Sequence, residues 1–445
     1  MPKRPAPTAL AIGSTIRGAR AAARLTQAQL GARIGYSGSA VSRIESGELH
    51  PDQDTIALIG QLLQLAPEQL GLTAPSRGLP SRPSPMPAAP VAATVASVPD
   101  HQEDAVRRRN LLAGAVGLGA ALALPGATAA AGAPASDPAA PVERALFNPQ
   151  SVPAWTAARV ATALSSARAD FRAARYAALG SALPALIAGA EAARDDTQGH
   201  AREHAHSAVA RTYVLATELA FKEHADFAWV TADRALAAAR TGGDPVVIGE
   251  AARVLAITMR RAGRPQAAVD FLARTAATMT GPGAERQVRA TLLLTAAYTA
   301  ATGSRRSTAL SLMSEAEDAV AAPAPAVGGL FTVEASRAQC DVYWIGVHNA
   351  LGTPDEGVPY AARIAPQALP SAERRARYAT DAARMWHALG DQRRTFGALR
   401  AVEAAAPEEA RRPALQALTA GLLYGPGTMP GLRDFARRTG AVTIA

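Results

Sequence analysis

Apolar residues recur at helical spacing near the start of the chain. Ile12, Ile16, Ala19 and Ala23 lie three or four positions apart, so that they share one face of a helix. The residues between them are mainly polar or small. The pattern predicts an amphipathic helix from about residue 10 whose apolar face packs against further elements.

Capping signals divide the sequence that follows into short helices. Thr26 offers an N-cap and Gln29, three residues later, completes the pattern of a capping box. We expect a second helix that ends near Ile34, because Gly35 is a typical C-terminal stop.

A third helix is predicted to begin at Ser37 and to end at Gly47, with a fourth after Pro51 and a fifth after Pro67. Five short helices in residues 10–72, with a tight turn between the second and third, describe a compact helix-turn-helix domain.

Residues 10–72 resemble the Xre/lambda-repressor-like family, most clearly in "LTQAQLGARIGYSGSAVSRIESGELHP". The resemblance implies that the second helix begins with Gln27 donating to a DNA phosphate, and that the third helix lies in the major groove. Arg20 and Glu45 match an ion pair that belongs to the scaffold. Residues 1–72 carry seven lysines and arginines against five acidic residues, so one copy binds DNA weakly. We therefore expect a homodimer on a double-stranded operator with two half-sites.

The candidate DNA contacts lie at the turn and on the third helix: Ser37, Gly38, Ser39, Ser42 and Arg43. Arg43 suits a bidentate contact to guanine, and the two serines at 37 and 39 suit phosphate or base contacts. Gly38 stands where relatives often carry a long polar residue. A domain retained only for binding protein is the alternative.

The composition excludes some classes of site but does not by itself indicate a function. The 445 residues carry a formal charge of +9, with lysine only at Lys3 and Lys222, and 49% are hydrophobic. Arginine with abundant alanine is typical of a high-GC genome, and we expect an actinobacterial source and thin helical cores. The single Cys340 excludes an internal disulfide and a site with several cysteines. The sequence "MPKRPAPTALAIG" has no apolar segment of a signal peptide.

A Pro/Ala-rich stretch at 73–105 reads as a disordered linker, and 106–131 follows as "VRRRNLLAGAVGLGAALALPGATAAA". The latter resembles a twin-arginine export signal, and similar actinobacterial regulators carry such a run at this junction. Its apolar part, Leu111 to Leu124, spans roughly 21 Å as a helix, short of a hydrocarbon core of about 30 Å. We favour a cytoplasmic linker helix; membrane association and a downstream start are the alternatives.

The remainder of the chain shows a repeat of about 40 residues. Prolines mark its ends at Pro245, Pro282, Pro323, Pro366 and Pro407, and glycines mark its middle at Gly263, Gly303, Gly352 and Gly390. The segments "RVLAITMRRAGRPQAAVDFLARTAATMTGPG" and "RMWHALGDQRRTFGALRAVEAAAP" resemble tetratricopeptide repeats. We predict an all-α protein with about six helical hairpins within a repeat domain at 153–440.

In such arrays the first helix of each hairpin lines the concave face. The candidate ligand contacts on this face are Tyr213, Arg253, Arg260, Tyr343, Arg377 and Arg384, with Thr217 and Thr380 beside them. Arginine with tyrosine suits an acidic ligand or a C-terminal carboxylate, most naturally of a peptide. A solvated groove and a protein docking face remain as alternatives.

No catalytic motif was found, so we expect neither an enzyme nor a cofactor. "GHAREHAH" places His200 and His204 on one helix face, but it lacks a third ligand, and we expect no metal. The preferred hypothesis is a cytoplasmic transcriptional regulator whose repeat domain binds a peptide, small ligand or protein. The alternative is a helical-repeat scaffold or interaction protein, either free or associated with a membrane, that the helix-turn-helix domain localises.

Overall fold

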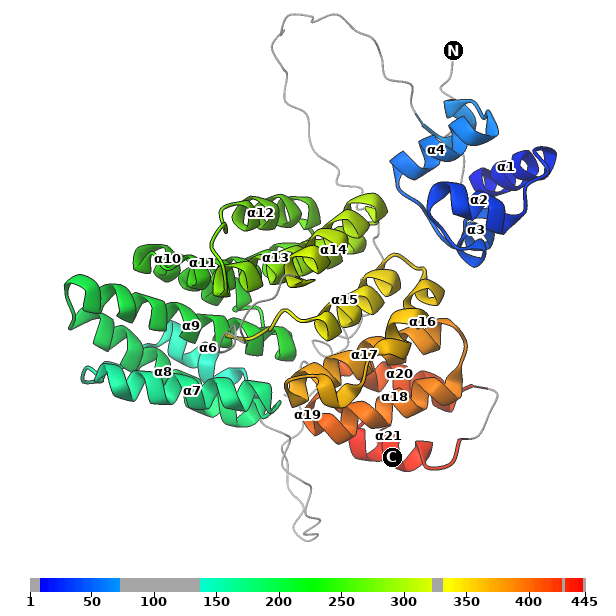
Figure 1. Cartoon of the computed structure of the whole chain (residues 1–445). Helices are drawn as coiled ribbons and strands as arrows, with labels where there is room; N and C mark the ends of the chain where they lie inside the picture. Colours follow the sequence, from blue (N-terminus) through cyan, green and yellow to red (C-terminus); the bar gives the residue numbers. More distant parts are fainter. Residues whose placement is uncertain (1–8, 73–136, 322–330, 426–428, 443–445) are drawn as a thin grey trace, which may run out of the picture.

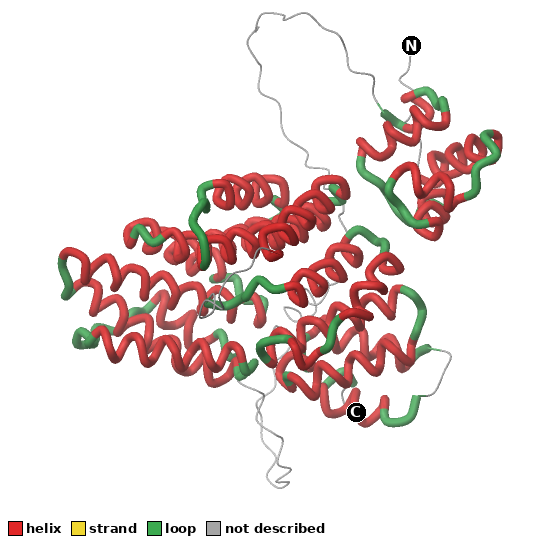
Figure 2. Tube along the Cα trace, in the orientation of Figure 1, coloured by secondary structure: helices red, strands yellow, loops and turns green. Residues whose placement is uncertain are grey.

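The structure is a computed structural model that describes residues 9–72, 137–321, 331–425 and 429–442. Every regular element in these ranges is a helix, and no strand occurs among them (Figure 2). The all-α prediction is therefore confirmed. The linker predicted at 73–105 and the signal-like stretch at 106–131 lie outside the described residues.

The N-terminal domain contains five short helices: α1 (Ala9–Ala22), α2 (Gln27–Ile34), α3 (Gly38–Glu45), α4 (Gln53–Leu63) and the 3-10 helix η1 (Pro67–Leu70). Thr26 and Gln29 form the predicted capping box at the start of α2. Gly35 ends α2 at φ +70°, in the left-handed region that glycine adopts without steric cost. Local side-chain chemistry thus sets the boundaries of the helix-turn-helix unit.

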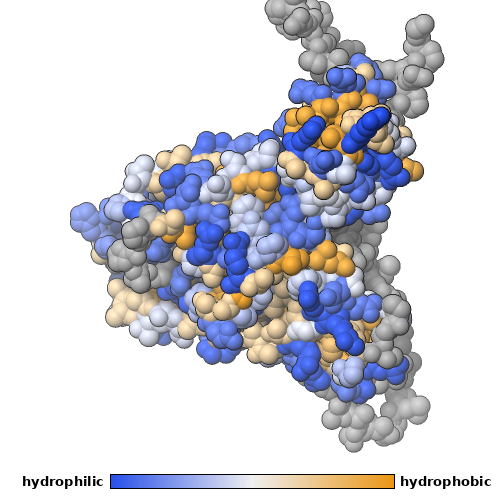
Figure 3. All heavy atoms as spheres, turned by 45° about the vertical axis from the view of Figure 1, so that its right-hand side comes forward, coloured by the Kyte–Doolittle hydropathy of each residue, from blue (hydrophilic) through white to orange (hydrophobic). Residues whose placement is uncertain are grey.

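The core of this domain is small and apolar. Ile16, Leu30, Ala40 and Ile59 are fully buried, so that one residue from each of α1, α2, α3 and α4 meets in the centre. Figure 3 shows the domain lying directly against the rest of the molecule, with hydrophobic residues gathered on the face that is turned toward the viewer. The shared core packs α2 and α3 against each other.

The C-terminal part is an array of paired helices that begins after a short helix, α6 (Ala140–Phe147). The pairs are α7 (Ala157–Arg172) with α8 (Tyr176–Asp195), α9 (Gly199–Glu223) with α10 (Ala228–Gly242), α11 (Pro245–Arg261) with α12 (Pro265–Ala277), α13 (Ala284–Thr302) with α14 (Arg306–Ala321), α15 (Arg337–Ala350) with α16 (Pro354–Arg363), and α17 (Ala372–Ala388) with α18 (Gln392–Ala405). The 3-10 helix η2 (Pro366–Ala368), α19 (Pro407–Ala410), α20 (Pro413–Leu423) and α21 (Leu432–Thr439) complete the order.

The hairpins pack through small residues on their first helices. Ala256, Ala296 and Ala383 are fully buried, which allows neighbouring helices to approach closely. Among the described residues only α8 has the length and apolar composition of a membrane-crossing helix, and 50% of that stretch is buried inside the molecule. A place in the core of the array explains its composition.

The array curls until its two ends meet, so that α7 and α17 lie in contact (Figure 1). Arg172 of α7 pairs with Glu334 at 2.7 Å and donates to the Pro370 carbonyl oxygen. The hydroxyl of Tyr176 on α8 donates to Glu409 on α19 at 2.6 Å. This closure brings the first helices of successive hairpins around one cavity.

Candidate functional site

The surface predicted to read DNA is formed by α3 and the turn before it. Ser37 is the N-cap of α3, where its hydroxyl accepts from the Ala40 amide at 3.1 Å. Ser39 is exposed, whereas Ser42 and Arg43 are half-buried. Gly38, predicted to contact DNA, faces α2 instead, because a Cβ added there would lie 3.3 Å from the backbone of Ala28.

The predicted scaffold pair is present and gains a third member. Arg20 donates twice to Glu45, with Nη2 to Oε2 at 3.0 Å, and Glu45 is only 1% exposed. Gln27 donates to the same carboxylate at 2.9 Å. Burial by itself raises the pKa of Glu45, but the hydrogen bonds from Arg20 and Gln27 hold that pKa below its ordinary value. The resemblance assigned Gln27 to a phosphate, and in this structure its amide serves the buried carboxylate.

Ser37 and Ser39 contact the repeat array rather than solvent alone. Both hydroxyls donate to Oδ2 of Asp355, at 2.6 Å each. Asp355 lies in the first turn of α16. Burial by itself raises the pKa of Asp355, but the two serine hydrogen bonds and the charge of Arg43 hold it below its ordinary value.

A charged cavity of about 130 Å³ lies inside the curl of the array. It is lined from the first helices of five successive hairpins and from one arginine near the C-terminus. The lining residues are Glu218, Phe221 and Lys222 of α9, Arg253, Ile257, Arg260 and Arg261 of α11, Thr295 and Tyr298 of α13, Gln339, Val342, Tyr343 and Gly346 of α15, Glu373, Arg374, Arg377 and Asp381 of α17, and Arg412. The lining carries seven cations and three carboxylates, and a fourth carboxylate, that of Glu409, pairs with Lys222 and Arg412. Positive charge remains in excess, so the cavity favours an anion.

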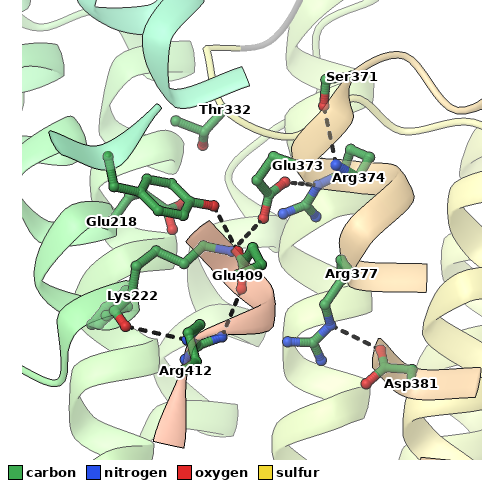
Figure 4. Close-up of polar contacts among 12 residues, drawn as sticks. Glu218, Lys222, Thr332, Ser371, Glu373, Arg374, Arg377, Asp381, Glu409 and Arg412 are labelled. Atoms are coloured by element: carbon green, nitrogen blue, oxygen red, sulfur yellow. Dashed lines mark hydrogen bonds and ion pairs between the residues drawn. The ribbon is translucent and has the colours of Figure 1, made fainter. Parts of the chain in front are cut away.

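Ion pairs organise the wall of the cavity (Figure 4). Lys222 pairs with Glu373 at 2.7 Å and with Glu409, and thereby joins α9 to α17 and α19. Arg377 pairs with Asp381 at 2.8 Å. Burial by itself raises the pKa of Glu409, yet the charges of Lys222 and Arg412 lower it to about 2. These pairs hold the surrounding guanidinium groups in fixed directions.

Gln339 stands apart from these satisfied groups. Its side chain is in the cavity lining and the residue is 1% exposed. Neither its amide nitrogen nor its amide oxygen has a hydrogen-bond partner among the described residues. A buried amide without a protein partner is costly, so its two polar atoms favour a hydrogen-bonding group that enters the cavity.

Four of the six predicted ligand contacts line this cavity: Arg253, Arg260, Tyr343 and Arg377. Tyr213 does not; its hydroxyl donates to Glu191 at 2.7 Å, behind the concave face. Arg384 is exposed and also lies outside the lining.

Sequence reasoning missed Gln339, Lys222 and the three acidic residues of the lining. A signal for several of them existed, because Gln339 lies four positions before Tyr343, and Glu373 and Asp381 lie four positions on either side of Arg377. A search one helical turn before and after each predicted residue would have identified these neighbours. No comparable signal identifies Lys222, whose partners come from distant hairpins.

The other candidate chemistry does not form a site within the described residues. His200 is exposed and pairs with Glu203 at 2.9 Å. No group of three histidine, cysteine or acidic residues with metal-binding geometry occurs in that part of the chain. Burial raises the pKa of the Cys340 thiol to about 12, so it is a weak nucleophile near neutral pH.

Comparison with known proteins identifies one part of the chain. Residues 11–71 match the family model of a helix-turn-helix domain. The match supports the N-terminal part of the resemblance, and no family match supports the likeness to tetratricopeptide repeats. No curated protein and no solved structure matches the chain. The chain therefore carries a helix-turn-helix domain joined to an array of helical hairpins.

Proposed function

We propose that this protein is a sequence-specific DNA-binding transcriptional regulator of the Xre type that acts in the cytoplasm. The observation that carries the proposal is the helix-turn-helix domain at 11–71, with its capped α2 and α3 and the ion pair of Arg20 and Glu45 behind them. In domains of this fold the second helix of the motif enters the major groove. No catalysis is required for this role.

Arg43 is the residue we assign to base recognition. It lies on α3, where a guanidinium group can donate two hydrogen bonds to the O6 and N7 atoms of guanine. Ser37, Ser39 and Ser42 contribute phosphate contacts that fix the position of α3. Two copies on adjacent half-sites provide the affinity that a single domain of low charge lacks.

The test begins by selecting bound duplexes from a random pool with the full chain. Arg43→Ala is expected to weaken binding to the selected sequence about 10- to 100-fold, because a bidentate contact contributes about 1–3 kcal/mol, and to relax selection at one position. Arg240→Ala, on the exposed side of α10, is the charge-matched control. Unchanged sequence preference in Arg43→Ala contradicts specific reading and favours a scaffold that binds DNA only for localisation.

We further propose that the array is a tetratricopeptide-like sensor that binds an acidic ligand, such as the C-terminal carboxylate of a peptide. The excess of cations in the cavity and the unpartnered amide of Gln339 support this ligand class. A ligand that prefers one curvature of the array changes the geometry of a dimer, and so the spacing of its two DNA-binding domains.

A matched pair of short peptides tests this ligand class. One peptide has a free C-terminus, and its partner has the same sequence with a C-terminal amide. Calorimetry is expected to detect binding of the free acid and at least tenfold weaker binding of the amide, since the amide lacks the charge. Equal binding of both forms contradicts recognition of the carboxylate. Analytical ultracentrifugation of the full chain tests the dimer.

A further inference from the structure

The N-termini of two helices from different parts of the chain meet at the same pair of carboxylates. Asp355 and Glu356 occupy the first turn of α16, and the N-cap of α3 lies opposite them. Oδ2 of Asp355 accepts from the hydroxyls of Ser37 and Ser39. Glu356 accepts from the amide of Ser37 at 3.0 Å. Both helix dipoles therefore favour the negative charge at this junction.

Arg306, the first residue of α14, completes the contact. Its Nε donates to the carbonyl oxygen of Gly35 at 2.9 Å, and its guanidinium group lies 4.0 Å from the centroid of the Tyr36 ring. Another of its nitrogens donates to Glu356 at 2.6 Å. Arg306 is only 5% exposed, so it is enclosed between the two parts of the molecule. We call the set Arg306, Asp355 and Glu356 the clamp.

The clamp holds the part of the helix-turn-helix domain that is predicted to face DNA. Its side chains form hydrogen bonds with the turn between α2 and α3 and with the first residues of α3. The turn between α15 and α16 lies against the other end of that surface, since a Cβ added at Gly352 would lie 3.3 Å from the Arg43 guanidinium group. A duplex and the clamp cannot occupy this surface together.

The chemistry of the clamp resembles that of a DNA backbone. A carboxylate that accepts from two serine hydroxyls and lies at a helix N-terminus makes the contacts that a phosphate makes at such a position. The carboxylate of Asp355 therefore accepts from Ser37 and Ser39 the hydrogen bonds that these hydroxyls can donate to a phosphate.

We propose that the clamp is an autoinhibitory contact in which Asp355 and Glu356 mimic DNA phosphates and hold α3 against the repeat array. The inference rests on the proposed DNA binding. DNA binds only the open form, so the apparent dissociation constant equals the intrinsic constant divided by the open fraction. Weakening the clamp raises the open fraction and tightens DNA binding without any change in the DNA contacts themselves.

Two substitutions, one that removes a negative charge and one that removes a positive charge, test the proposal in the full chain. The probe is a fluorescent duplex of random sequence and about 40 base pairs, which reports phosphate contacts without requiring the operator. Asp355→Ala and Arg306→Ala are each expected to bind it about tenfold more tightly than the wild type in fluorescence anisotropy, because each removes charge-assisted hydrogen bonds of the closed form. A simple charge effect predicts tighter binding for Asp355→Ala and weaker binding for Arg306→Ala.

Asp233→Ala and Arg240→Ala are the matched controls, because both residues are exposed on α10 and carry the same charges. Tighter binding by both clamp variants, with the controls within about twofold of the wild type, supports the proposal. Opposite changes, or no change, in the clamp variants overturn it and leave the proposed DNA binding intact. No binding by any of the five proteins, at low salt as well, overturns both.

Hydrogen exchange provides a second measurement that does not involve DNA. In the closed form the Ser37 amide is bonded to Glu356, so its exchange is slow. Both clamp variants are expected to accelerate exchange around Ser37 while the amides of α9 and α13 keep their protection. Unchanged exchange at Ser37 overturns the clamp, and retained protection elsewhere shows that the variants are folded.

Discussion

Replacing Gln339 with methionine is expected to stabilise the protein. The residue is 1% exposed, and both polar atoms of its side chain lack partners in the part of the chain that the structure describes. Methionine has a similar length and an adaptable apolar side chain. An unsatisfied buried polar group costs about 1–3 kcal/mol, and this cost is removed in Gln339→Met. The expected gain in the free energy of unfolding is thus about 1–3 kcal/mol, or roughly 2–6 °C in Tm for a domain of this size.

Gln416→Met is the control, because that side chain has a defined role. Its amide nitrogen donates to the Thr439 carbonyl oxygen at 2.8 Å, and the substitution is expected to lower stability by about 1 kcal/mol. Thermal and urea unfolding, followed by circular dichroism, measure both variants beside the wild type. A loss of stability in Gln339→Met, comparable to that of the control, refutes the reasoning, since it shows that the Gln339 amide is satisfied in the folded protein.

The same variant tests the proposed ligand site. If Gln339 is retained for binding, Gln339→Met combines a gain in stability with at least tenfold weaker binding of the free-acid peptide, because the lost amide leaves ligand groups unpaired. A gain in stability with unchanged peptide affinity separates the amide from ligand recognition.

Three further outcomes are expected from charged groups. Lys222→Met leaves the buried carboxylates Glu373 and Glu409 without their shared cation, so urea unfolding is expected to show a loss of about 3–5 kcal/mol; a loss below 1 kcal/mol contradicts this. Burial and the charge of a neighbouring arginine lower the pKa of His348 to about 4, so its contribution to stability is complete above pH 6.5 and falls by about 3 kcal/mol as pH drops to 4. His348→Gln is expected to remove that part of the pH dependence, and identical pH profiles rule it out. Arg20→Met is expected to unfold the N-terminal domain about 10 °C earlier while the repeat array keeps its Tm in calorimetry; an unchanged first transition shows that the pair contributes little.

Helix boundaries in the N-terminal domain were accessible from sequence because their causes are local. The capping box of Thr26 and Gln29 spans three residues, and the stop at Gly35 depends on one residue's φ angle. The turn glycines of the array are similar, since Gly263 and Gly390 lie between paired helices at φ +75° and +77°. Such signals act within one helical turn, so no knowledge of the tertiary structure is needed to read them.

The candidate sites were predictable only in part. The prediction that the first helix of each hairpin lines the concave face correctly identified Arg253, Arg260, Tyr343 and Arg377 as residues of one site. It did not identify Lys222, because the carboxylates that hold it come from α17 and α19, more than 150 residues later. Ion pairs between residues so far apart in the sequence leave no local pattern from which they could be predicted.

The sequence by itself determined that the chain forms helices, where many of them begin and end, and that a helix-turn-helix motif lies at the N-terminus. Only the tertiary structure decided that the array closes, with Tyr176 bonded to Glu409, and that Asp355 lies on the serines of α3. The physical reason is that closure depends on the accumulated rotation between hairpins, which is set by how buried alanines pack. A small change at each interface moves the ends of the array apart, so these contacts belong to the whole fold.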